Sequence, residues 1–422
     1  MQRSSSASAS GIQSTLTAGG TRGASGPSPW RWHVLTFLFF ATTINYLDRI
    51  VLAVLIPVIR KDLAFSDREY GFITGAFQIA YMLGFLAAGK MIDLLGTRIG
   101  YAAAMLWWSI SALLHVVSRG TWSLGFWRGM LGFGEAGNYP AAVKAVAEWF
   151  PEKERSTAVG LFNSGTTLAA VLGPPVLVAL TSAYGWRASF ALTALSGLIW
   201  LLIWLAVYRW PPQQMEGEAL HSVTWREAMR DHRTRGIAWI KFLTDGVWWF
   251  YLFWLPPYLF DARKLNLNQI GWALPAIYLM AGVGSVAGGW LAGFLIRRGW
   301  PVAGARRAVM AVVAICMPVA ATAVFTSNIV LAIALISLAT AGHQAWTTSL
   351  FTIPTDIFPK ATVASVVGIG GCAGGLGGFL FSAILPGYVV TYFGYVPMFV
   401  LAGVLHPLAW MVGTRLLWRN AS

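Results

Sequence analysis

Charged side chains are scarce in this chain. Asp, Glu, Lys and Arg make up 11% of its 422 residues, whereas soluble domains carry about 25%. Together with a hydrophobic content of 57%, this scarcity excludes an ordinary soluble protein. The sequence therefore predicts an integral membrane protein, with the lipid bilayer as its main surrounding.

Other absences narrow the class further. The chain has only two cysteines, Cys316 and Cys372, and both fall in apolar segments, so no disulfide framework is expected. The sequence shows no phosphate-binding loop, no His/Cys set with metal-ligand spacing and no extramembrane stretch large enough for an active site. We therefore expect no enzyme activity, no cofactor and no metal. The net charge of +14 does not indicate nucleic acid, because no Lys/Arg run stands beside stacking aromatics on a polar face.

Residues 1–29 differ from the rest of the chain. They are rich in Ser, Gly, Thr and Ala and contain no acidic residue. Such a segment cannot bury enough apolar surface to fold, and it has no apolar core typical of a secretory signal. We expect a disordered cytoplasmic tail. An organelle transit peptide is the alternative, although the segment lacks amphipathic periodicity.

Apolar stretches of about 20 residues are the signal of membrane-spanning helices. The sequence has twelve of them, approximately at 33–59, 69–92, 99–118, 122–147, 156–182, 187–208, 237–260, 269–295, 306–326, 328–352, 362–390 and 393–417. The longest polar break, 209–235, separates six spans from six. We therefore expect an all-α membrane protein: a six-helix bundle over 30–208, a cytoplasmic central loop over 209–235 and a second six-helix bundle over 236–422.

The distribution of Lys and Arg indicates the orientation. If both termini are cytoplasmic, 18 of the 30 Lys and Arg residues fall in cytoplasmic segments, 7 fall in outer loops and 5 fall in spans or at their ends. Cytoplasmic loops of membrane proteins carry the excess of positive charge. We therefore expect a multi-pass protein of the cell inner membrane with both termini in the cytoplasm.

The two halves of the chain repeat one another. The segment "WFPEKERSTAVG" (149–160) matches "IFPKATVASVVG" (357–368), and "YGWRASF" (184–190) matches "FGYVPMF" (393–399). The repeated helices run in the same direction, because an offset of six helices preserves orientation. Halves related in this way bind their ligand near the bilayer midplane, where the two halves meet.

One turn carries a family resemblance. The segment "GKMIDLLGTRIG" (89–100) resembles the signature of the major facilitator superfamily, through Gly89, Asp93, Gly96 and Arg98. The resemblance implies a conformational latch at these four residues, in which an Asp–Arg pair holds the halves in one conformation. In the second half Gly293 stands where an acidic residue is usual, which puts a second latch in doubt.

Three longer stretches resemble a narrower family. They are "INYLDR" (44–49), "RGMLGFGEAGNYPAAVKAVAEWFPEKERSTAVGLFNSG" (128–165) and "KFLTDGVWWFYLFWLPPYL" (241–259). They are similar to the anion:cation symporter family and, within it, to the hexuronate transporter branch; "GHQ" (342–344) is similar too. The resemblance covers essentially all of 30–420. It implies proton-coupled uptake of an organic anion such as a sugar acid.

Two pairs of charged residues lie deep inside predicted spans. Asp48 and Arg49 lie roughly 25 Å along the first span, and Arg128 and Glu135 lie about 10 and 21 Å into the fourth, which runs the opposite way. The two pairs can therefore meet. Charges inside a membrane mark substrate or proton pathways, and Arg binds a carboxylate through two parallel hydrogen bonds. The resemblance assigns proton coupling to Asp48 and Glu135, and anion binding to Arg49 and Arg128. Purely structural ion pairs are the alternative.

Further candidates surround these charges. A sugar acid needs hydroxyl partners and a flat apolar wall, so we add the following residues to the predicted substrate site: Tyr81, Asn138, Trp248, Trp249, His343, Gln344 and Lys241. For each Trp the alternative is packing or an interface anchor, and for His343 it is helix packing. Lys241 is close enough to the cytoplasmic boundary to extend its ammonium to the surface. We expect His115 and His406 to be structural, and Glu148, Lys144 and Asp356 to join contacts at the cytoplasmic gate.

The sequence thus predicts a proton-coupled symporter that imports an organic anion, most simply a sugar acid such as a hexuronate or aldonate. The two halves would alternate access to a central site, and we expect the protein to act as a monomer. One alternative keeps the fold but makes it an exporter or exchanger of an organic anion or drug. A second alternative is a membrane sensor that transports nothing.

Overall fold

The computed structural model describes residues 29–150, 152–208, 228–358 and 360–418. It leaves aside the side chains of residues 86, 89, 90, 93, 152–157, 355 and 360–365. All regular structure in the described ranges is helical. The expected tail over 1–29 and most of the expected loop over 209–235 lie outside the described residues, and α8 begins at His232, inside the latter range.

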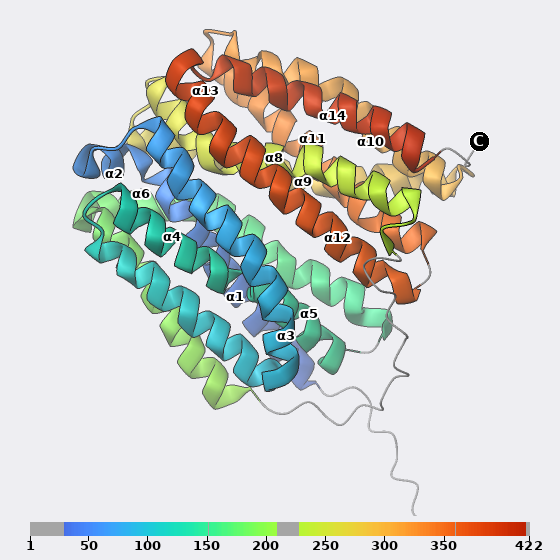
Figure 1. The fold of residues 1–422 in the computed structure, drawn as a ribbon, viewed down its shortest axis with the longest axis horizontal. Coiled ribbons are helices and arrows are strands. Elements are labelled where there is room, and N and C mark those ends of the chain that lie inside the picture. Colours follow the sequence, from blue (N-terminus) through green and yellow to red (C-terminus); the bar gives the residue numbers. More distant parts are fainter. Residues whose placement is uncertain (1–28, 151, 209–227, 359, 419–422) are drawn as a thin grey trace, which may run out of the picture.

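The first half of the chain contains six helices and one 3₁₀ turn: α1 (Trp30–Val54), α2 (Ile56–Leu63), α3 (Asp67–Leu114), η1 (His115–Val117), α4 (Thr121–Glu135), α5 (Asn138–Trp149) and α6 (Glu152–Val207). The second half contains α8 (His232–Asp261), α9 (Leu267–Arg297), α10 (Val302–Ala321), the 3₁₀ turn η2 (Thr322–Val324), α11 (Ile329–Ile357), α12 (Lys360–Gly378), the π-helical η3 (Phe379–Ile384), α13 (Leu385–Phe393) and α14 (Val396–Leu416). Figure 1 shows the helices of the first half, blue to green, gathered beside those of the second half, yellow to red.

Three glycines divide long helical stretches into separate spans. Gly96 and Gly185 interrupt α3 and α6 with φ values of 72° and 82°, and Gly394 follows α13 with φ 70°. Residues with a Cβ rarely adopt such positive φ values. With α3 and α6 each counted as two spans, and α4–α5 and α12–η3–α13 each as one, the chain crosses the bundle twelve times. The prediction of twelve spans is confirmed.

The internal repeat is also visible in the backbone. Gly185 and Gly394 occupy the same position of the two matched segments, 209 residues apart, and both have positive φ. Each glycine makes a tight turn between the last two spans of its half. The same local sequence thus produces the same reversal twice.

The bundle has two ends. We call the end at which α1, α8 and α12 begin the terminal end, and the end at which α1, α8 and α13 finish the opposite end. Side-chain caps define the starts of two helices at the opposite end. Ser66 accepts from the Glu69 amide while the Glu69 carboxylate accepts from Ser66, and Asn266 and Gln269 form the same reciprocal pair. Such capping boxes satisfy amide groups that a helix start leaves free.

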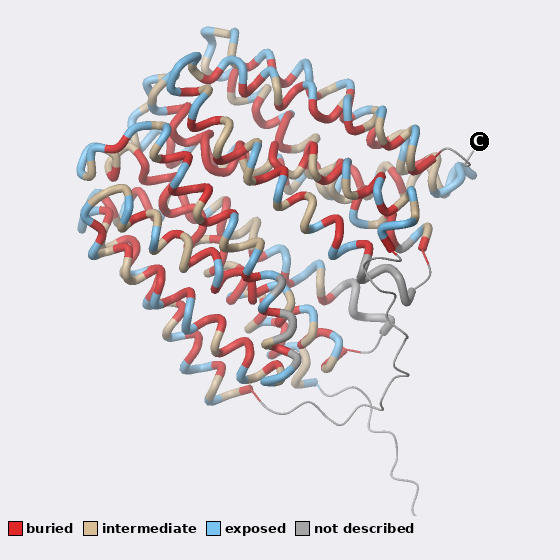
Figure 2. Tube along the Cα trace, viewed as in Figure 1, coloured by how far each residue is buried: buried red, intermediate tan, exposed pale blue. Residues whose placement is uncertain are grey.

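The outer surface of the bundle is apolar. Large hydrophobic side chains point outward, including Trp272 at 74% exposure and Val286 at 73%, and Figure 2 shows exposed positions along the outward faces of the helices. Eight of the described helical segments are long and apolar enough to cross a membrane by length and composition. This surface matches lipid rather than water.

Small residues bring the helices of each half close together. A Cβ on Gly284 of α9 would collide with the main-chain oxygen of Ala341 in α11, and a Cβ on Gly377 of α12 would collide with that of Phe242 in α8. Backbone contact of this kind drives helix association where lipid removes the hydrophobic effect between helices. In the first half, Gly132 of α4 approaches the main-chain oxygen of Phe77, and Gly165 of α6 approaches that of Phe39 in α1, in the same way.

Candidate functional site

A buried ion pair joins α1 to α4. Arg49 donates from Nε and Nη2 to Glu135 Oε2, at 3.0 and 2.9 Å. Asn45, one turn before Arg49, accepts from Arg49 Nη2 at 3.2 Å and donates to the main-chain oxygen of Glu135 at 3.3 Å. Both charged side chains are almost completely buried. The two predicted charge pairs therefore meet at one depth, as their helical spacing indicated.

The second arginine has different partners. Arg128 is buried, and its guanidinium donates to two main-chain carbonyls of α1, those of Asp48 at 3.2 Å and of Arg49. It lies over the ring of Phe77 at 5.3 Å. In this conformation Arg128 therefore fixes the backbone of α1 against α4.

Both carboxylates of this cluster have oxygens that no described residue hydrogen-bonds. Within the described part of the chain, neither carboxylate oxygen of Asp48 has a hydrogen-bond partner, and Glu135 Oε1 has none either. Thr193 lies near Asp48, but its hydroxyl donates to the main-chain oxygen of Phe190 at 3.1 Å. Buried polar atoms are normally hydrogen-bonded, so such exceptions need a functional or structural explanation. A site that exchanges protons or ligand is one such explanation.

Aromatic rings surround the Arg49 guanidinium. Its central carbon lies 4.8 Å from the ring centre of Tyr81 and 5.2 Å from that of Trp249, with Phe77 and Tyr46 at 5.6 and 5.7 Å. Trp249 belongs to α8, in the second half of the chain, whereas the other three rings belong to the first half. The Arg49 guanidinium therefore lies where the halves meet.

The histidine candidates lie deeper in the second half. His343 of α11 stacks on Trp248 with ring centres 5.8 Å apart, and its Nδ1 is 3.2 Å from His406 Nε2. Its Nε2 is 3.2 Å from the Thr347 hydroxyl. His406 is fully buried, as expected for a structural residue. His343 thus packs against the Trp248 ring, in agreement with the helix-packing alternative for this histidine. The His343 ring still lies next to the interface of the halves.

The amide candidates also differ in their surroundings. Asn138 is buried within the first half, where it accepts from the Tyr101 hydroxyl at 2.5 Å and donates to Thr42 at 3.4 Å. Gln344 is half-buried on α11 beside His343. Of the two, Asn138 is bonded inside its own half and Gln344 is the more accessible.

Lys241 has a partner that the sequence analysis missed. Its ammonium lies 2.6 Å from Asp245 Oδ2, one turn along α8, and over the ring of Phe351 at 4.6 Å. A sequence signal was available, because an acidic residue four positions after a lysine in an apolar helix lies on the same face. The alternative that Lys241 extends to the membrane surface is not what the structure shows.

The signature turn is described only in part. Gly96 makes the turn, and Arg98 donates to the main-chain oxygen of Leu205 at 2.6 Å, at the end of α6. Gly89 and the Asp93 side chain lie outside the described side chains, so the Asp93–Arg98 latch stays a prediction. The residues expected at a gate bond within their own halves: Glu148 accepts from Thr97 at 2.7 Å, and Asp356 lies 3.3 Å from Arg306. Lys144 donates to Ile92 O at 3.2 Å.

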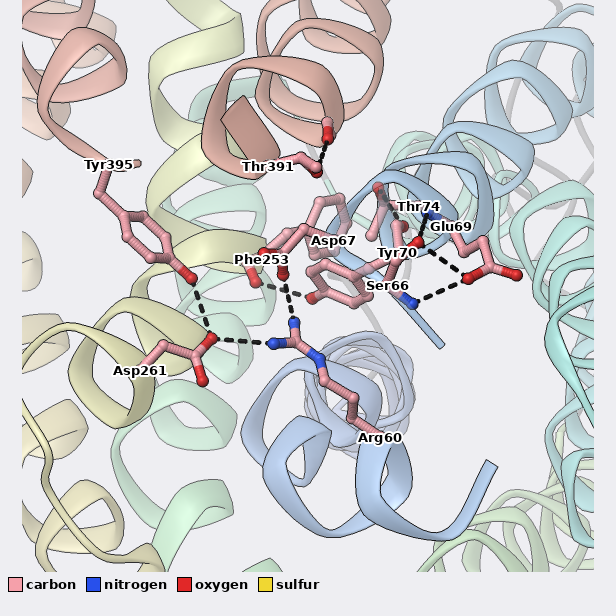
Figure 3. Close-up of polar contacts among 11 residues, drawn as sticks. Arg60, Ser66, Asp67, Glu69, Tyr70, Thr74, Phe253, Asp261, Thr391 and Tyr395 are labelled. Carbon is pink, nitrogen blue, oxygen red and sulfur yellow. Dashed lines mark hydrogen bonds and ion pairs between the residues drawn. The ribbon is translucent and has the colours of Figure 1, made fainter. Parts of the chain in front are cut away.

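The opposite end carries ion pairs between the halves. The Arg60 guanidinium of α2 lies 2.7 Å from the Asp67 carboxylate of its own half and 2.9 Å from the Asp261 carboxylate of the second half. Tyr395 donates to the same Asp261 oxygen at 3.2 Å, and Figure 3 shows these side chains converging on Arg60. We call Arg60, Asp67, Asp261 and Tyr395 the opposite-end network. One turn deeper, Tyr70 donates to the main-chain oxygen of Phe253 at 2.7 Å, again across the halves.

No group of three or more His, Cys, Asp or Glu side chains in the described ranges could hold a metal ion.

The cluster around Arg49 offers guanidinium donors, carboxylate oxygens without a described hydrogen-bond partner, and aromatic faces. Such groups bind a small polar anion and exchange protons.

Comparison with known proteins identifies the family. The family model described as Major Facilitator Superfamily matches residues 38–382. The chain belongs to this superfamily. Within the superfamily it falls in the hexuronate transporter-like branch. It is therefore a multi-pass membrane transporter rather than an enzyme, with twelve helices in two six-helix bundles.

Relatives cover most of the chain. It is 30% identical to the hexuronate transporter of Escherichia coli K12, over 92% of this chain and 93% of that protein. It is 31% identical to the galacturonate transporter of Dickeya chrysanthemi, over 62% of this chain and 81% of the relative. The D-galactonate transporter of Escherichia coli O6:H1 is 28% identical, over 89% and 92%.

Solved structures share the fold. A bacterial homolog of the human lysosomal transporter Spinster, in an inward-facing and occupied conformation, matches with a TM-score of 0.75 and 19% identity, over 93% of this chain and 99% of that one. A D-xylose–proton symporter matches with a TM-score of 0.73 and 15% identity, over 92% and 98%. At these identities the likeness concerns the fold alone.

Proposed function

We propose that this superfamily member is a proton-coupled symporter that imports a sugar acid, a hexuronate or an aldonate, by alternating access. The observation that carries the proposal is the Arg49 guanidinium at the interface of the halves, ringed by aromatics and held by Glu135. The curated relatives include transporters named for hexuronate, galacturonate and galactonate, which supports a sugar acid as the substrate class.

The proposed division of labour starts from the Arg49–Glu135 pair. While Glu135 is ionised, it occupies two donors of Arg49. Protonation of Glu135 removes its charge and releases these donors, because a neutral carboxyl binds a guanidinium far less strongly than a carboxylate does. A substrate carboxylate then takes its place. Loading of a proton and loading of the anion thus favour each other at the same guanidinium.

The remaining residues support this exchange. Asp48, with both oxygens open and close to the cluster, accepts a second proton. Arg128 anchors the anion site by holding the α1 backbone at Asp48 and Arg49, and its free Nε offers a further donor. Tyr81 and Trp249, whose rings meet edge to face, offer aromatic surface to the sugar carbons, and Trp248, His343 and Gln344 add groups from the second half. Asn138 and Lys241 complete the proposed set.

The experiment is uptake into proteoliposomes. Purified protein is reconstituted, an inward proton gradient is imposed, and entry of radiolabelled D-glucuronate or D-gluconate is followed against time. We expect accumulation above equilibrium that a protonophore abolishes. Uptake that only equilibrates, and that ignores the proton gradient, would instead favour an exchanger of the same fold.

The proposal also includes orientation and assembly. Both termini would be cytoplasmic in the cell inner membrane, in keeping with the excess of Lys and Arg in the segments on that side. One chain contains both halves and the complete cluster between them, so a monomer suffices for transport.

A further inference from the structure

An ion pair in α8, with Lys241 buried and Asp245 half-buried, lies outside the cluster around Arg49. Lys241 Nζ lies 2.6 Å from Asp245 Oδ2, with side-chain exposures of 9% and 21%. The pair lies in an apolar stretch of α8. It precedes Trp248 and Trp249 and is therefore closer than they are to the terminal end of the bundle. The proposed function names Lys241 as a candidate contact and gives Asp245 no part.

Helix stability does not account for the pair. An acidic residue four positions before a lysine stabilises a helix better than the reverse order found here. A buried ion pair can often be replaced by apolar side chains without loss of stability. Its retention therefore requires another explanation.

The neighbouring helix is built around the pair. A Cβ on Gly374 of α12 would collide with Asp245 Oδ2, and a Cβ on Gly370 would lie 2.9 Å from Lys241 Cδ. Two glycines one turn apart thus leave room for both charged side chains. The pair occupies space that α12 leaves open for it.

The pair lies within reach of a ligand held at Arg49. Asp245 is four residues before Trp249, so both side chains lie on one face of α8, separated by roughly 6 Å along its axis. The Trp249 ring is 5.2 Å from the Arg49 guanidinium. A six-carbon acid anchored by its carboxylate at Arg49 can therefore extend past Trp249 toward Asp245, the more exposed member of the pair.

We propose that the Lys241–Asp245 pair recognises the end of the substrate farthest from the anchored carboxylate, and that Asp245 selects against a second carboxylate there. This inference rests on the proposed function. In wild type the two charges of the pair balance. Lys241 donates a hydrogen bond to the hydroxyl at the far end of the substrate, and Asp245 accepts one from it. A second carboxylate would instead meet the negative charge of Asp245, since like charges in a low-dielectric site repel strongly.

Two ligands that differ only at the far carbon test the inference. D-Gluconate ends in a hydroxymethyl group and D-glucarate ends in a carboxylate. Affinities for both are measured by isothermal titration calorimetry on the purified full-length chain. In Asp245→Asn, Lys241 becomes an unpaired cation, and we expect the affinity ratio of glucarate to gluconate to rise about tenfold or more. In Lys241→Met, Asp245 remains as an unpaired anion, and we expect the ratio to fall.

The double variant Lys241→Met/Asp245→Asn removes both charges, so its ratio should lie between those of the two single variants. Asp62→Asn is the matched control. The Arg187 guanidinium holds the pKa of Asp62 below its ordinary value at the surface of the opposite end, so the variant removes an acidic charge far along the bundle from Lys241 and Asp245. Its ratio should stay at the wild-type value.

The outcomes separate the inference from the proposed function. If wild type binds gluconate, but the two single variants shift the ratio in the same direction or by less than about twofold, the inference is wrong and the proposed function stands. If wild type binds neither of these acids nor D-glucuronate, the proposed function fails and the inference fails with it. Should Asp245→Asn not fold, Lys241→Met and the double variant still decide, because the ratio in the double variant should exceed that in Lys241→Met.

Discussion

At the scale of single residues, Arg49 pairs with one carboxylate among the described residues, that of Glu135, and this makes Glu135 the first residue to test. Glu135→Gln keeps the size of the side chain and removes its titratable proton. We expect loss of proton-driven accumulation, while exchange of labelled for unlabelled substrate across the membrane continues. Counterflow and gradient-driven uptake, measured on the same proteoliposomes, distinguish the two activities. Normal accumulation with normal pH dependence in this variant would make Glu135 structural.

Substitution of Arg49 and substitution of Arg128 should differ in their effect on the stability of the protein. Arg49 binds a side chain, whereas Arg128 binds two main-chain oxygens of α1. Arg128→Ala removes two hydrogen bonds that hold the α1 backbone to α4, and a hydrogen bond that involves a charged group contributes about 1.5–3 kcal/mol. We expect both Arg49→Ala and Arg128→Ala to abolish substrate binding, but only Arg128→Ala to lower the melting temperature markedly. Thermal unfolding and ligand titration of both proteins check this, and equal melting temperatures would contradict it.

At the scale of elements, the opposite-end network connects α2 and α3 of the first half with the end of α8 and the start of α14 in the second. Arg60 binds one carboxylate from each half, and these side chains are only about one quarter to one third exposed. Separating the halves at this end breaks the Arg60–Asp261 pair and leaves both charges without that partner. The network therefore favours the conformation in which the halves touch at that end.

Breaking the network should shift the conformational equilibrium. In Asp261→Asn, Arg60 loses its charged partner in the second half but keeps Asp67, so we expect the halves to separate at the opposite end more often. Spin labels placed on both halves at that end should report a larger population of long distances. Asp67→Asn is the control, because it removes a partner within the first half and leaves the bond across the halves in place. An equal effect of both variants would show that the network only supports local folding.

The helices could be predicted from the sequence because their causes are local. Apolar runs of membrane length, the polar break before α8 and the glycine turns are all visible in the chain. The meeting of Arg49 with Glu135 was also predictable, since residue counts along two antiparallel spans give their depths. The match of Gly185 with Gly394 indicated the repeat before any coordinates did.

Side-chain pairings across distant segments could not be predicted in this way. Arg60 and Asp261 are 201 residues apart, and their contact depends on how the halves pack at one end. Arg128 faces main-chain oxygens rather than a carboxylate, a choice that depends on the rotation of α4 about its axis. His343 contacts His406 across 63 residues of sequence, through side chains that reach from α11 to α14. Asp245 differs from these, because its spacing from Lys241 already showed the pair.

At the scale of the whole molecule, the charge distribution predicts which end faces the cytoplasm. Leu220→Cys places a thiol in the predicted cytoplasmic loop, and Lys264→Cys places one at the opposite end, in a background without Cys316 and Cys372. A membrane-impermeant maleimide added to intact cells should label position 264 and spare position 220 until the cells are opened. Labelling of position 220 from outside would reverse the orientation.

The number of titratable carboxylates bears on the energetics of the whole transport cycle. Import of a monoanion against a negative-inside potential costs about 2.3 kcal/mol per 100 mV. One accompanying proton cancels this electrical work, and a second proton turns the potential into a driving force. The cluster contains two carboxylates, Asp48 and Glu135, and both have oxygens without a hydrogen-bond partner among the described residues.

We therefore expect electrogenic uptake, with more than one proton entering for each monoanion. In proteoliposomes without a pH gradient, a potassium diffusion potential set by valinomycin, negative inside, should drive accumulation of D-gluconate, and the reversed potential should suppress it. Asp48→Asn removes one of the two carboxylates and should leave a cycle with a single proton, in which uptake depends on the pH gradient alone. Wild-type uptake that is indifferent to the potential would mean that one carboxylate keeps its charge throughout the cycle, and Asp48 would then be the residue to reassign.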